Sequence, residues 1–357
     1  MNNQLFTEIL ISWGSNNKRD LPWIDTKDVY KIWISEIILQ QTRVAQGKNY
    51  YKTFLQNFPD IFSLESASED EVLKAWEGLG YYSRARNLHF TAKQIVKDFE
   101  GHFPDNYTDI LKLKGIGPYT AAAISSFAFE EARPVIDGNV LRLITRVLGI
   151  ETQVELKETQ IEIMEFLEKA IQKSVPSQFN QALMDFGSLI CTPKNPNCNL
   201  CPFIHHCVAS KNNLQNTLPL KNKKLVKKER HFHFLDIRDA SEKVLILHKR
   251  EDSDIWKKLY ELPQFERTAK TFSEPKDIKR TLNNIESDTE IELIKVHKID
   301  SYKQVLTHQI IYAHFYKVIV TSLPSKINHP HYLVESKKVS NFAFPKVIGD
   351  YFSSSHF

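Results

Sequence analysis

The sequence predicts two domains of different class: an all-α domain over residues 1–212 and an α/β domain over residues 231–357, joined by a basic linker at 213–230. Three observations lead to this division. The chain has 357 residues, which is enough for two hydrophobic cores. Helical periodicity dominates before residue 212. Runs rich in β-branched and aromatic residues follow residue 230.

The first domain contains a predicted helix that is apolar around nearly its whole circumference, "YKIWISEIILQQTRV" at residues 30–44. Glu36 lies in its middle, and glutamate is rarely buried without a partner. A second helix is expected after Ser68, which forms a capping box with Glu71. Other helices are expected near the N-terminus and at 120–129, 139–150 and 158–173.

The linker includes "LPLKNKKLVKKER" at residues 218–230, which is basic and has no useful period. It is either a solvated tether or a segment whose lysines lie along a phosphate backbone. The second domain shows partial alternation typical of strands at 231–237, 243–249, 291–299 and 309–320. Helices are expected at 274–286 and 345–352, so this domain is predicted to be a small α/β domain.

The composition is that of a water-soluble protein, with 42% hydrophobic and 25% charged residues and a formal net charge of +4. The mild charge permits a nucleic-acid partner without requiring one. No apolar run approaches the roughly 20 residues that cross a bilayer, so we expect no membrane association. The N-terminus lacks the features of a signal peptide, which predicts a cytoplasmic protein. We also expect a monomer.

The four cysteines of the chain lie in one segment, with the spacing C-x6-C-x2-C-x5-C. In a reducing compartment this clustering favours a metal or cluster site over disulfides. The spacing alone suits either tetrahedral zinc or an iron–sulfur cluster. The expected ligands are Cys191, Cys198, Cys201 and Cys207.

A glycine-containing turn occurs in "LKLKGIGPYTAAAI", residues 111–124, between two predicted helical segments. Gly115 and Gly117 would let another backbone approach closely and would leave amides exposed at the start of the second helix. Such amides bind a phosphate without reading its base. An ordinary helix connection is the alternative interpretation.

Two acidic residues in the first domain have environments that should push their pKa values apart. Glu36 lies among aliphatic and indole groups, which should raise its pKa. Asp137, in "ARPVIDGNVLRLI", precedes an apolar helix, whose N-terminus favours a charged carboxylate. Asp137 also fits a plain N-cap, and the two roles are compatible. A reaction through an oxocarbenium ion needs one proton donor and one anion, which this pair would supply.

Several longer motifs carry a resemblance to a known family. "GIGPYTA" followed by "VIDGN" resembles the helix-hairpin-helix and Gly/Pro-Asp loop of the base-excision DNA glycosylases. "LPW", "WISEIILQQT", "GLGYYSRARNLH" and "FNQALMDFG" are similar to motifs of the MutY-type adenine DNA glycosylases. The resemblance covers residues 1–212 and is weaker in the C-terminal half. It implies removal of adenine mispaired with 8-oxoguanine, or with guanine, from double-stranded DNA.

The resemblance also implies roles for the acidic residues. Glu36 would protonate adenine at N7. Asp137 would stabilise the sugar cation or capture it covalently, and Asn139 would help to position it. Four further residues match positions that fill the opened duplex or line the adenine pocket: Gln41, in the same predicted helix as Glu36, and Tyr81, Trp23 and Gln181. Trp23 could instead pack the core, and Tyr81 could be a surface aromatic.

Two positions differ from relatives or from the wider superfamily. Superfamily members that also cleave the strand carry a lysine where this chain has Tyr119, and a phenol cannot form the Schiff base of that reaction. The sequence therefore predicts a monofunctional glycosylase. Many relatives carry arginine directly after "LPW", where this chain has Ile24. Arg19 is one group that could replace that arginine.

The resemblance identifies the cysteine segment as the ligand loop of a [4Fe–4S] cluster. It further implies that the C-terminal domain is Nudix-like, or MutT-like, although no stretch fits the Nudix catalytic box. "QVLTHQIIYAHFY" is similar to the region through which relatives recognise 8-oxoguanine, so Thr307 and His308 are the candidate contacts. A hairpin whose polar residues satisfy one another is the alternative.

Three other functions compete with this prediction. An endonuclease III-like glycosylase and lyase is disfavoured by Tyr119 and by the extra domain. A non-catalytic iron–sulfur DNA-binding protein would make both carboxylates structural. A Nudix-type hydrolase is disfavoured by the missing box.

Overall fold

The structure is a computed structural model that describes residues 1–222, 226–251, 253–267, 274–285, 292–324 and 326–354. Residues 223–225 of the expected linker lie outside this part of the chain. Within it, no helix combines the length and the apolar character that crossing a membrane requires.

The chain forms two compact units, which differ from the expected contiguous division. Unit 1 comprises Met1–Ser66 and Asn87–Lys223, and unit 2 comprises Ala67–Arg86 and Lys224–Phe357. The segment Ala67–Arg86 therefore belongs with the C-terminal half, although its sequence lies inside the helical half.

Side-chain contacts explain why Ala67–Arg86 joins unit 2. Helix α5 (Glu69–Ala75) begins with the capping box of Ser68 and Glu71 that the sequence predicts. Asp70 in this helix accepts hydrogen bonds from Lys249 Nζ at 2.6 Å and from the Tyr260 hydroxyl at 3.0 Å. These contacts join residues that are far apart in the sequence, so local pattern could not reveal them.

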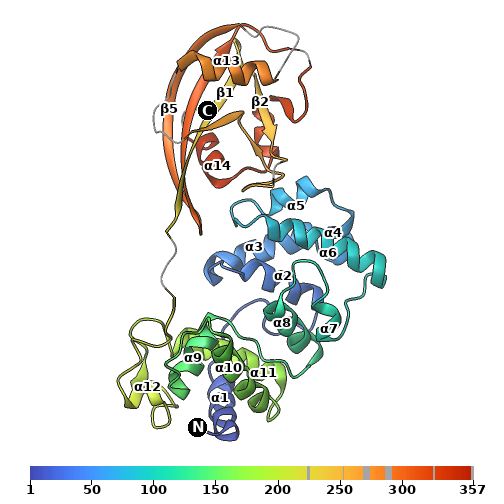
Figure 1. Cartoon of the computed structure of the whole chain (residues 1–357). Coiled ribbons are helices and arrows are strands. Elements are labelled where there is room, and N and C mark those ends of the chain that lie inside the picture. Colours follow the sequence, from blue (N-terminus) through green and yellow to red (C-terminus); the bar gives the residue numbers. More distant parts are fainter. Residues whose placement is uncertain (223–225, 252, 268–273, 286–291, 325, 355–357) are drawn as a thin grey trace. The chain divides into compact units, whose positions relative to one another are not determined.

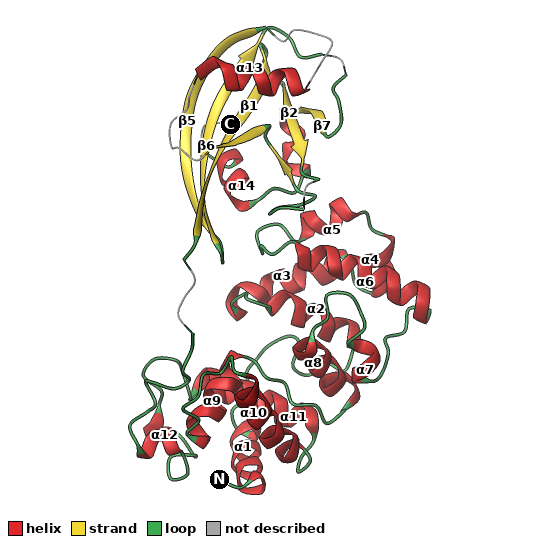
Figure 2. Cartoon of the chain, viewed as in Figure 1, coloured by secondary structure: helices red, strands yellow, loops and turns green. Residues whose placement is uncertain are grey.

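Among its described residues, unit 1 is helical, as predicted (Figure 2). Its elements are α1 (Asn3–Ser15), α2 (Val29–Leu39), α3 (Val44–Asn57), α4 (Ile61–Ser66), most of α6 (Ser83–Phe99), α7 (Tyr107–Ile110), α8 (Pro118–Phe129), α9 (Gly138–Leu148), α10 (Lys157–Ile171), α11 (Pro176–Leu189), η1 (Cys198–Leu200) and α12 (Val208–Lys211).

The helix predicted over residues 30–44 ends at Leu39, so Gln41 does not share a helix with Glu36. Gln40 leaves the helical region at ψ 112°, and its amide donates to Thr120 Oγ1 at 3.0 Å. Gln41 follows in the left-handed region at φ 57°. The predicted helix end was wrong because the apolar residues stop at Leu39. Gln40, the next residue, forms its hydrogen bond with Thr120 instead of continuing the helix.

One hydrophobic cluster in unit 1 joins α1, α9, α10 and α11. Phe6 lies at its centre, stacked on Phe203 at 5.1 Å between ring centroids. Helix α9 ends at Gly149, whose φ of 72° is in the left-handed region that favours glycine. A Cβ atom there would lie 2.3 Å from Val208, so the close approach of α9 and α12 also requires glycine.

Unit 2 is built on a mixed sheet, as the sequence predicts for an α/β domain (Figure 1). The strands run in the order β3-β2-β1-β6-β5, with β4 paired to β1 and β7 to β2. Strands β1 and β6 are parallel, and the other pairs are antiparallel. The strands are β1 (Lys228–Asp239), β2 (Val244–Lys249), β3 (Tyr260–Glu261), β4 (Gln264–Arg267), β5 (Leu293–Val305), β6 (Gln309–Val320) and β7 (His331–Glu335).

Alternation along the strands sends side chains to two faces, each covered by a helix. Leu235 faces α13 (Glu274–Ile285), whose apolar side includes Ile278. On the other face, Phe315 stacks on Tyr351 of α14 (Lys346–Phe352), with ring centroids 4.3 Å apart. A short helix η2 (Ser336–Asn341) follows β7. Strand β1 begins at Lys228, three residues earlier than the expected domain start at residue 231.

Candidate catalytic and recognition sites

Glu36 is buried, with 7% of its surface exposed, although it can carry a charge. Apolar neighbours in α2 are themselves buried, among them Ile32, Trp33 and Ile37. Burial is the largest cause that raises the pKa of Glu36, to about 7. The carboxyl group is therefore substantially protonated near neutral pH, as its apolar surroundings in the sequence predict.

Tyr119 lies beside Glu36 because α8 packs against α2. A hydrogen bond from the Tyr119 hydroxyl opposes part of the rise in the pKa of Glu36. Burial, together with the charges of Glu36 and Asp137, raises the pKa of Tyr119 well above its usual value. The phenol therefore stays neutral and acts as a hydrogen-bond donor to the carboxyl group.

Asp137 is the N-cap of α9 and lies within electrostatic range of Glu36, whose pKa its charge also raises. Its Oδ1 accepts from the backbone amides of Asn139 and Val140, both at 2.8 Å. Its Oδ2 accepts from the Asn139 side-chain amide at 2.7 Å. Asn139 thus holds the carboxylate through both its backbone and its side chain, and this orients Asp137.

Two buried arginines that the sequence analysis missed connect Asp137 to the cysteine loop. Arg142 donates from Nη2 to Asn139 Oδ1 at 2.8 Å and from Nε to the Cys191 carbonyl at 2.7 Å. Arg146, one turn later, donates to Cys191 Sγ at 3.3 Å. Two arginines four residues apart in an apolar helix were the available signal, because they point to one face and need buried acceptors.

The four cysteines are free and line one small cavity, together with Arg146 and apolar side chains such as Phe203. Burial raises the pKa of Cys201 to about 12. Across the described part of the chain, no group of three or more His, Cys, Asp or Glu side chains is arranged to hold a single metal ion.

The glycine turn between α7 and α8 has the geometry that glycine permits. Gly115 has φ 79°, and a Cβ atom there would lie 2.6 Å from the Cβ of Asn87. Gly117 is the N-cap of α8, and a Cβ atom there would meet open space. Both glycines are exposed, so the backbone at the start of α8 is accessible.

Trp23 and Gln181 lie on different elements of unit 1. Trp23 is half-buried and packs edge-on against Tyr51, with ring centroids 5.3 Å apart. Gln181, in α11, lines a cavity of about 460 Å³ together with Ile24 and Asp185. Neither Glu36 nor Asp137 is among the described residues that line this cavity.

Tyr81, Thr307 and His308 come together in unit 2, although Tyr81 lies more than 200 residues before the other two. They line one cavity of about 890 Å³, formed by the loop before α6 and the turn between β5 and β6. The hydroxyl groups of Tyr81 and Thr307 are hydrogen-bonded. Tyr81 has φ 48° and is 44% exposed, so its ring is presented to solvent rather than packed in a core.

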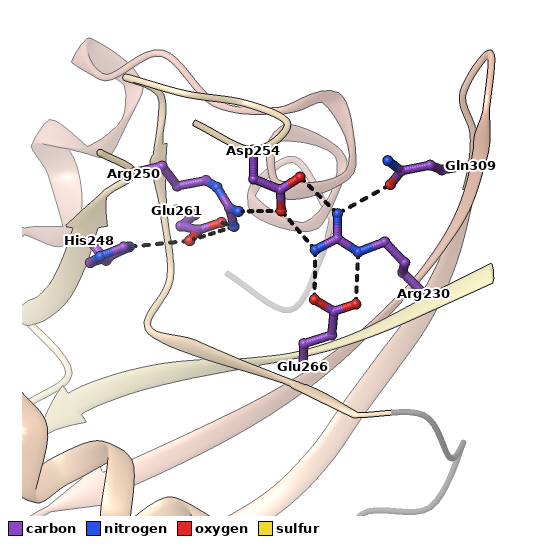
Figure 3. A network of polar contacts seen from close by, with 7 residues as sticks. All are labelled: Arg230, His248, Arg250, Asp254, Glu261, Glu266 and Gln309. Carbon is purple, nitrogen blue, oxygen red and sulfur yellow. Dashed lines mark hydrogen bonds and ion pairs between the residues drawn. The ribbon is translucent and has the colours of Figure 1, made fainter. Parts of the chain in front are cut away.

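An ion-pair network borders this cavity and holds Gln309, the first residue of β6 (Figure 3). Arg230 of β1 donates to Asp254 at 2.7 Å and to Glu266 at 2.6 Å. It also donates to Gln309, the residue after His308, at 3.2 Å. Because one planar guanidinium joins three chain segments, it restrains the turn that carries Thr307 and His308.

The network continues into the core of unit 2 (Figure 3). Arg250 donates to both carboxylate oxygens of Glu261 at 3.1 Å and to Asp254 at 3.3 Å. His248 contacts Glu261 at 3.2 Å. Glu261 and Arg250 are both buried, so each depends on the other for charge compensation.

The predicted residues therefore gather in separate groups. Unit 1 brings together Glu36, Tyr119, Asp137 and Asn139. Unit 2 brings together Tyr81, Thr307 and His308. Gln41 is exposed and lies two residues after the end of α2.

Both halves of the chain match known protein families. Residues 34–173 match the HhH-GPD superfamily of base excision DNA repair proteins, and residues 233–354 match the NUDIX domain. An adenine DNA glycosylase of Buchnera aphidicola subsp. Schizaphis graminum is 36% identical over 325 residues, covering 91% of this chain and 88% of the relative. The human adenine DNA glycosylase is 40% identical over 213 residues, covering 57% of this chain and 39% of the relative.

Solved structures resemble the helical part of the chain. A thermostable thymine-DNA glycosylase is 29% identical with a TM-score of 0.55, covering 59% of this chain and 97% of that protein. Endonuclease III in a non-covalent DNA complex has a TM-score of 0.52 at 19% identity, covering 59% of this chain and 96% of that protein. The second likeness concerns the fold alone.

The pKa of Glu36 predicts how stability changes with pH. The pKa is raised from 4.5 to about 7 on folding, so the folded state holds this proton more tightly. The stabilisation is complete below pH 4.5 and is lost as the pH rises through about 7. Relative to Glu36→Gln, which cannot ionise, the wild type should lose about 3 kcal/mol over this range.

Urea unfolding of both proteins between pH 4 and pH 8 measures this difference. Glu162→Gln is the matched control, because Glu162 is exposed on α10. Parallel stability profiles for wild type and Glu36→Gln would contradict the assigned environment of Glu36.

Proposed function

The chain belongs to the adenine DNA glycosylase family, and we propose that it hydrolyses the N-glycosidic bond of adenine opposite 8-oxoguanine, or opposite guanine, in double-stranded DNA. It acts in base excision repair, as a monomer and without strand cleavage of its own. The observation that carries this proposal is the buried carboxyl group of Glu36, with a pKa raised to about 7 beside Tyr119 and Asp137.

Glu36 is the general acid of the proposed reaction. The duplex hides the glycosidic bond, so adenine must first leave the base stack. Glu36 then transfers its proton to N7, and the electron pair of the C1′–N9 bond moves to the base as the bond breaks. A general acid is most effective when its pKa lies near the working pH, which burial achieves here.

Asp137 faces the sugar cation that adenine leaves behind. A carboxylate beside an oxocarbenium ion lowers the barrier by charge attraction, or forms a covalent bond with C1′. A water molecule then adds to C1′, displacing the Asp137 carboxylate where it has bonded to C1′, and the proton of that water passes to bulk solvent. The hydrogen bonds from Asn139 and Val140 hold the carboxylate in one orientation, so little reorganisation is needed during the reaction.

The position of Tyr119 supports a reaction without strand cleavage. Lyase chemistry in this superfamily uses an amine that forms a Schiff base with the sugar. A phenol cannot form that imine, and here its hydroxyl contacts Glu36 and the Met184 sulfur. The adenine-free sugar would therefore stay in an intact strand until alkali or another enzyme breaks it.

The remaining residues of the proposal concern DNA contacts. The exposed backbone at Gly115 and Gly117 suits a phosphate, which would be bound without sequence preference. Gln41 and Tyr81, both exposed and both at positive φ, are each proposed to fill or wedge the opened duplex. Trp23 and Gln181 are proposed to line the adenine pocket.

Thr307 and His308 are proposed to recognise 8-oxoguanine on the opposite strand. Both offer hydrogen-bonding groups to the cavity of unit 2 that also contains Tyr81. The side chains of Tyr81 and Thr307 are hydrogen-bonded to each other. This supports the proposal that they contact adjacent nucleotides, Tyr81 in the opened duplex and Thr307 at the opposite base.

A [4Fe–4S] cluster is proposed at Cys191, Cys198, Cys201 and Cys207. The donor set fits, because four free thiols line one cavity and Arg146 lies 3.3 Å from one sulfur. Iron favours the thiolate form, which would offset the high pKa that burial gives Cys201. The cluster would supply a rigid cross-link within the segment from Cys191 to Cys207, which Arg146 joins to α9. The acid–base chemistry stays with Glu36 and Asp137.

The central test is release of free adenine from duplexes that carry adenine opposite 8-oxoguanine, guanine or thymine. We expect rapid release opposite 8-oxoguanine and strand breaks only after alkali. Glu36→Gln should slow single-turnover release by about 100-fold to 10,000-fold, the usual contribution of a general acid. Glu162→Gln serves as the control. Breaks before alkali, or full activity of Glu36→Gln, would contradict the proposal.

Opposite-base recognition is tested by Thr307→Ala. Losing one hydrogen bond to 8-oxoguanine should lower the preference for 8-oxoguanine over guanine by about tenfold, which corresponds to about 1.4 kcal/mol. The preference is the ratio of adenine release rates from the two duplexes. Thr321→Ala, at an exposed position after β6, should leave the ratio unchanged. An unchanged ratio in Thr307→Ala would refute the assignment.

The cofactor is tested by metal analysis of the purified protein. We expect about four iron and four acid-labile sulfide per chain, with broad visible absorption. Cys198→Ser should lower the iron content. Ser210 lines the same cavity, and Ser210→Ala keeps all four thiols, so this variant should retain the iron. Stoichiometric zinc without sulfide would contradict the cluster.

A further inference from the structure

Arg84 is a half-buried cation in the first turn of α6, three residues after Tyr81. Its guanidinium carbon lies 5.4 Å from the centre of the Tyr81 ring and 5.3 Å from the centre of the Trp76 ring. Both distances are within the roughly 6 Å at which a cation is attracted to the face of an aromatic ring. Arg84 therefore joins two rings, and the proposed reaction gives it no role.

The same guanidinium holds the backbone of the turn that carries Tyr81. Arg84 Nη2 donates to the Gly80 carbonyl at 3.3 Å, and Trp76 Nε1 donates to this carbonyl at 3.1 Å. Gly80 and Tyr81 both lie in the left-handed region, at φ 71° and φ 48°. A residue other than glycine stays in that region only where its surroundings hold it, so these contacts help to fix the Tyr81 backbone.

Trp76 is the fixed part of this arrangement. It is fully buried at the C-cap of α5. Tyr81, in contrast, has 44% of its surface exposed. A buried ring cannot change its place without disturbing its neighbours, so it gives the guanidinium a defined position. Arg84 thus links the orientation of an exposed ring to that of a buried one.

Arg84 keeps its charge near neutral pH, which the attraction to both rings requires. Burial lowers its pKa to about 10, and the Tyr81 hydroxyl opposes part of this change. A partly desolvated cation is attracted to a ring more strongly than one in water, because less water screens the attraction.

We propose that Arg84 is a positioning residue that holds the Tyr81 ring in the orientation in which it enters the opened duplex. This inference rests on the proposed function, in which Tyr81 fills or wedges the opened duplex. An exposed side chain that rotates freely loses that freedom on binding, and the loss weakens the complex. Arg84 orders the ring before DNA arrives, so it should strengthen binding at the mispair and not elsewhere along the DNA.

A phosphate contact and support of the fold are the two alternative roles for Arg84. A phosphate contact would strengthen binding to every duplex and would add about one unit to the slope of log Kd against log salt concentration. Support of the fold would change the amount of active protein, and so the apparent affinity for every duplex by the same factor. Positioning of Tyr81 would change the ratio of the affinities for mispaired and undamaged duplexes.

The experiment measures the Kd of the full-length protein for two duplexes by fluorescence anisotropy at several salt concentrations. One duplex carries 2′-fluoro-2′-deoxyadenosine opposite 8-oxoguanine, because the electron-withdrawing fluorine slows loss of the base. The other is undamaged. The affinity ratio is the Kd for the undamaged duplex divided by the Kd for the mispaired duplex.

Two variants remove the charge of Arg84. Arg84→Met keeps the length of the side chain, and Arg84→Gln also keeps a donor for the Gly80 carbonyl. We expect both variants to lower the affinity ratio by about threefold to tenfold, the range that a cation–π contact provides. The salt dependence should stay unchanged.

Changes at Tyr81 test whether the effect acts through the ring. In a Tyr81→Phe background, which keeps the ring, Arg84→Met should lower the ratio by the same factor as in the wild type. In a Tyr81→Leu background, which has no ring, Arg84→Met should lower the ratio no further. Arg280 is an exposed arginine of α13 in the same unit, so Arg280→Met is the matched control and should preserve the ratio.

An unchanged ratio in Arg84→Met and Arg84→Gln would overturn the inference while leaving the proposed function intact. Equal weakening on both duplexes with a smaller salt slope would also overturn it and would assign Arg84 to a phosphate. An equal effect of Arg84→Met in the Tyr81→Leu background would contradict a role through the ring. If the wild type releases no adenine from any duplex, the proposed function fails, and the inference fails with it.

Discussion

The burial of one ionisable carboxyl group is the constraint on which unit 1 depends. Glu36 holds its proton near neutral pH because α2 is covered on nearly all sides, which requires the neighbouring helices α3 and α8. The charged form is disfavoured in that environment, so ionisation of Glu36 lowers the stability of the fold as the pH rises above about 7. The same burial keeps the proton that the proposed reaction uses. The Tyr119 hydroxyl donates a hydrogen bond to the Glu36 carboxyl group. This bond lowers the pKa of Glu36 by less than burial raises it, so the proton is kept.

A second constraint is the fixed orientation of Asp137, and α9 and α11 provide it together. Asp137 caps α9, and Asn139 joins that cap to the buried guanidinium of Arg142. Arg142 in turn binds backbone carbonyls of α11 and of the cysteine segment. The proposed cluster loop is therefore part of the scaffold behind the carboxylate, and its four thiols need no place in the reaction itself.

In unit 2, the main constraint is that a turn of polar residues is held in a defined place at the surface. The turn at Thr307 and His308 is restrained by Arg230, whose guanidinium binds Gln309 and two carboxylates (Figure 3). The segment Ala67–Arg86 adds Tyr81 to the same cavity. Polar groups from distant parts of the sequence thus line one cavity of unit 2, which suits the proposed recognition of 8-oxoguanine.

The sequence by itself determined the features that depend on neighbouring residues: the helical and α/β classes, the capping box at Ser68, the apolar surroundings of Glu36 and the cap at Asp137. Periodicity and capping act within one or two turns of chain, so they can be read locally. Only the tertiary structure decided that the helix of Glu36 ends at Leu39, that Ala67–Arg86 joins unit 2, and that Asp185 binds both Arg19 and Gln181. These features depend on contacts between residues far apart in the chain, and such contacts also fix where a helix ends. No local pattern encodes which distant partner a side chain will meet.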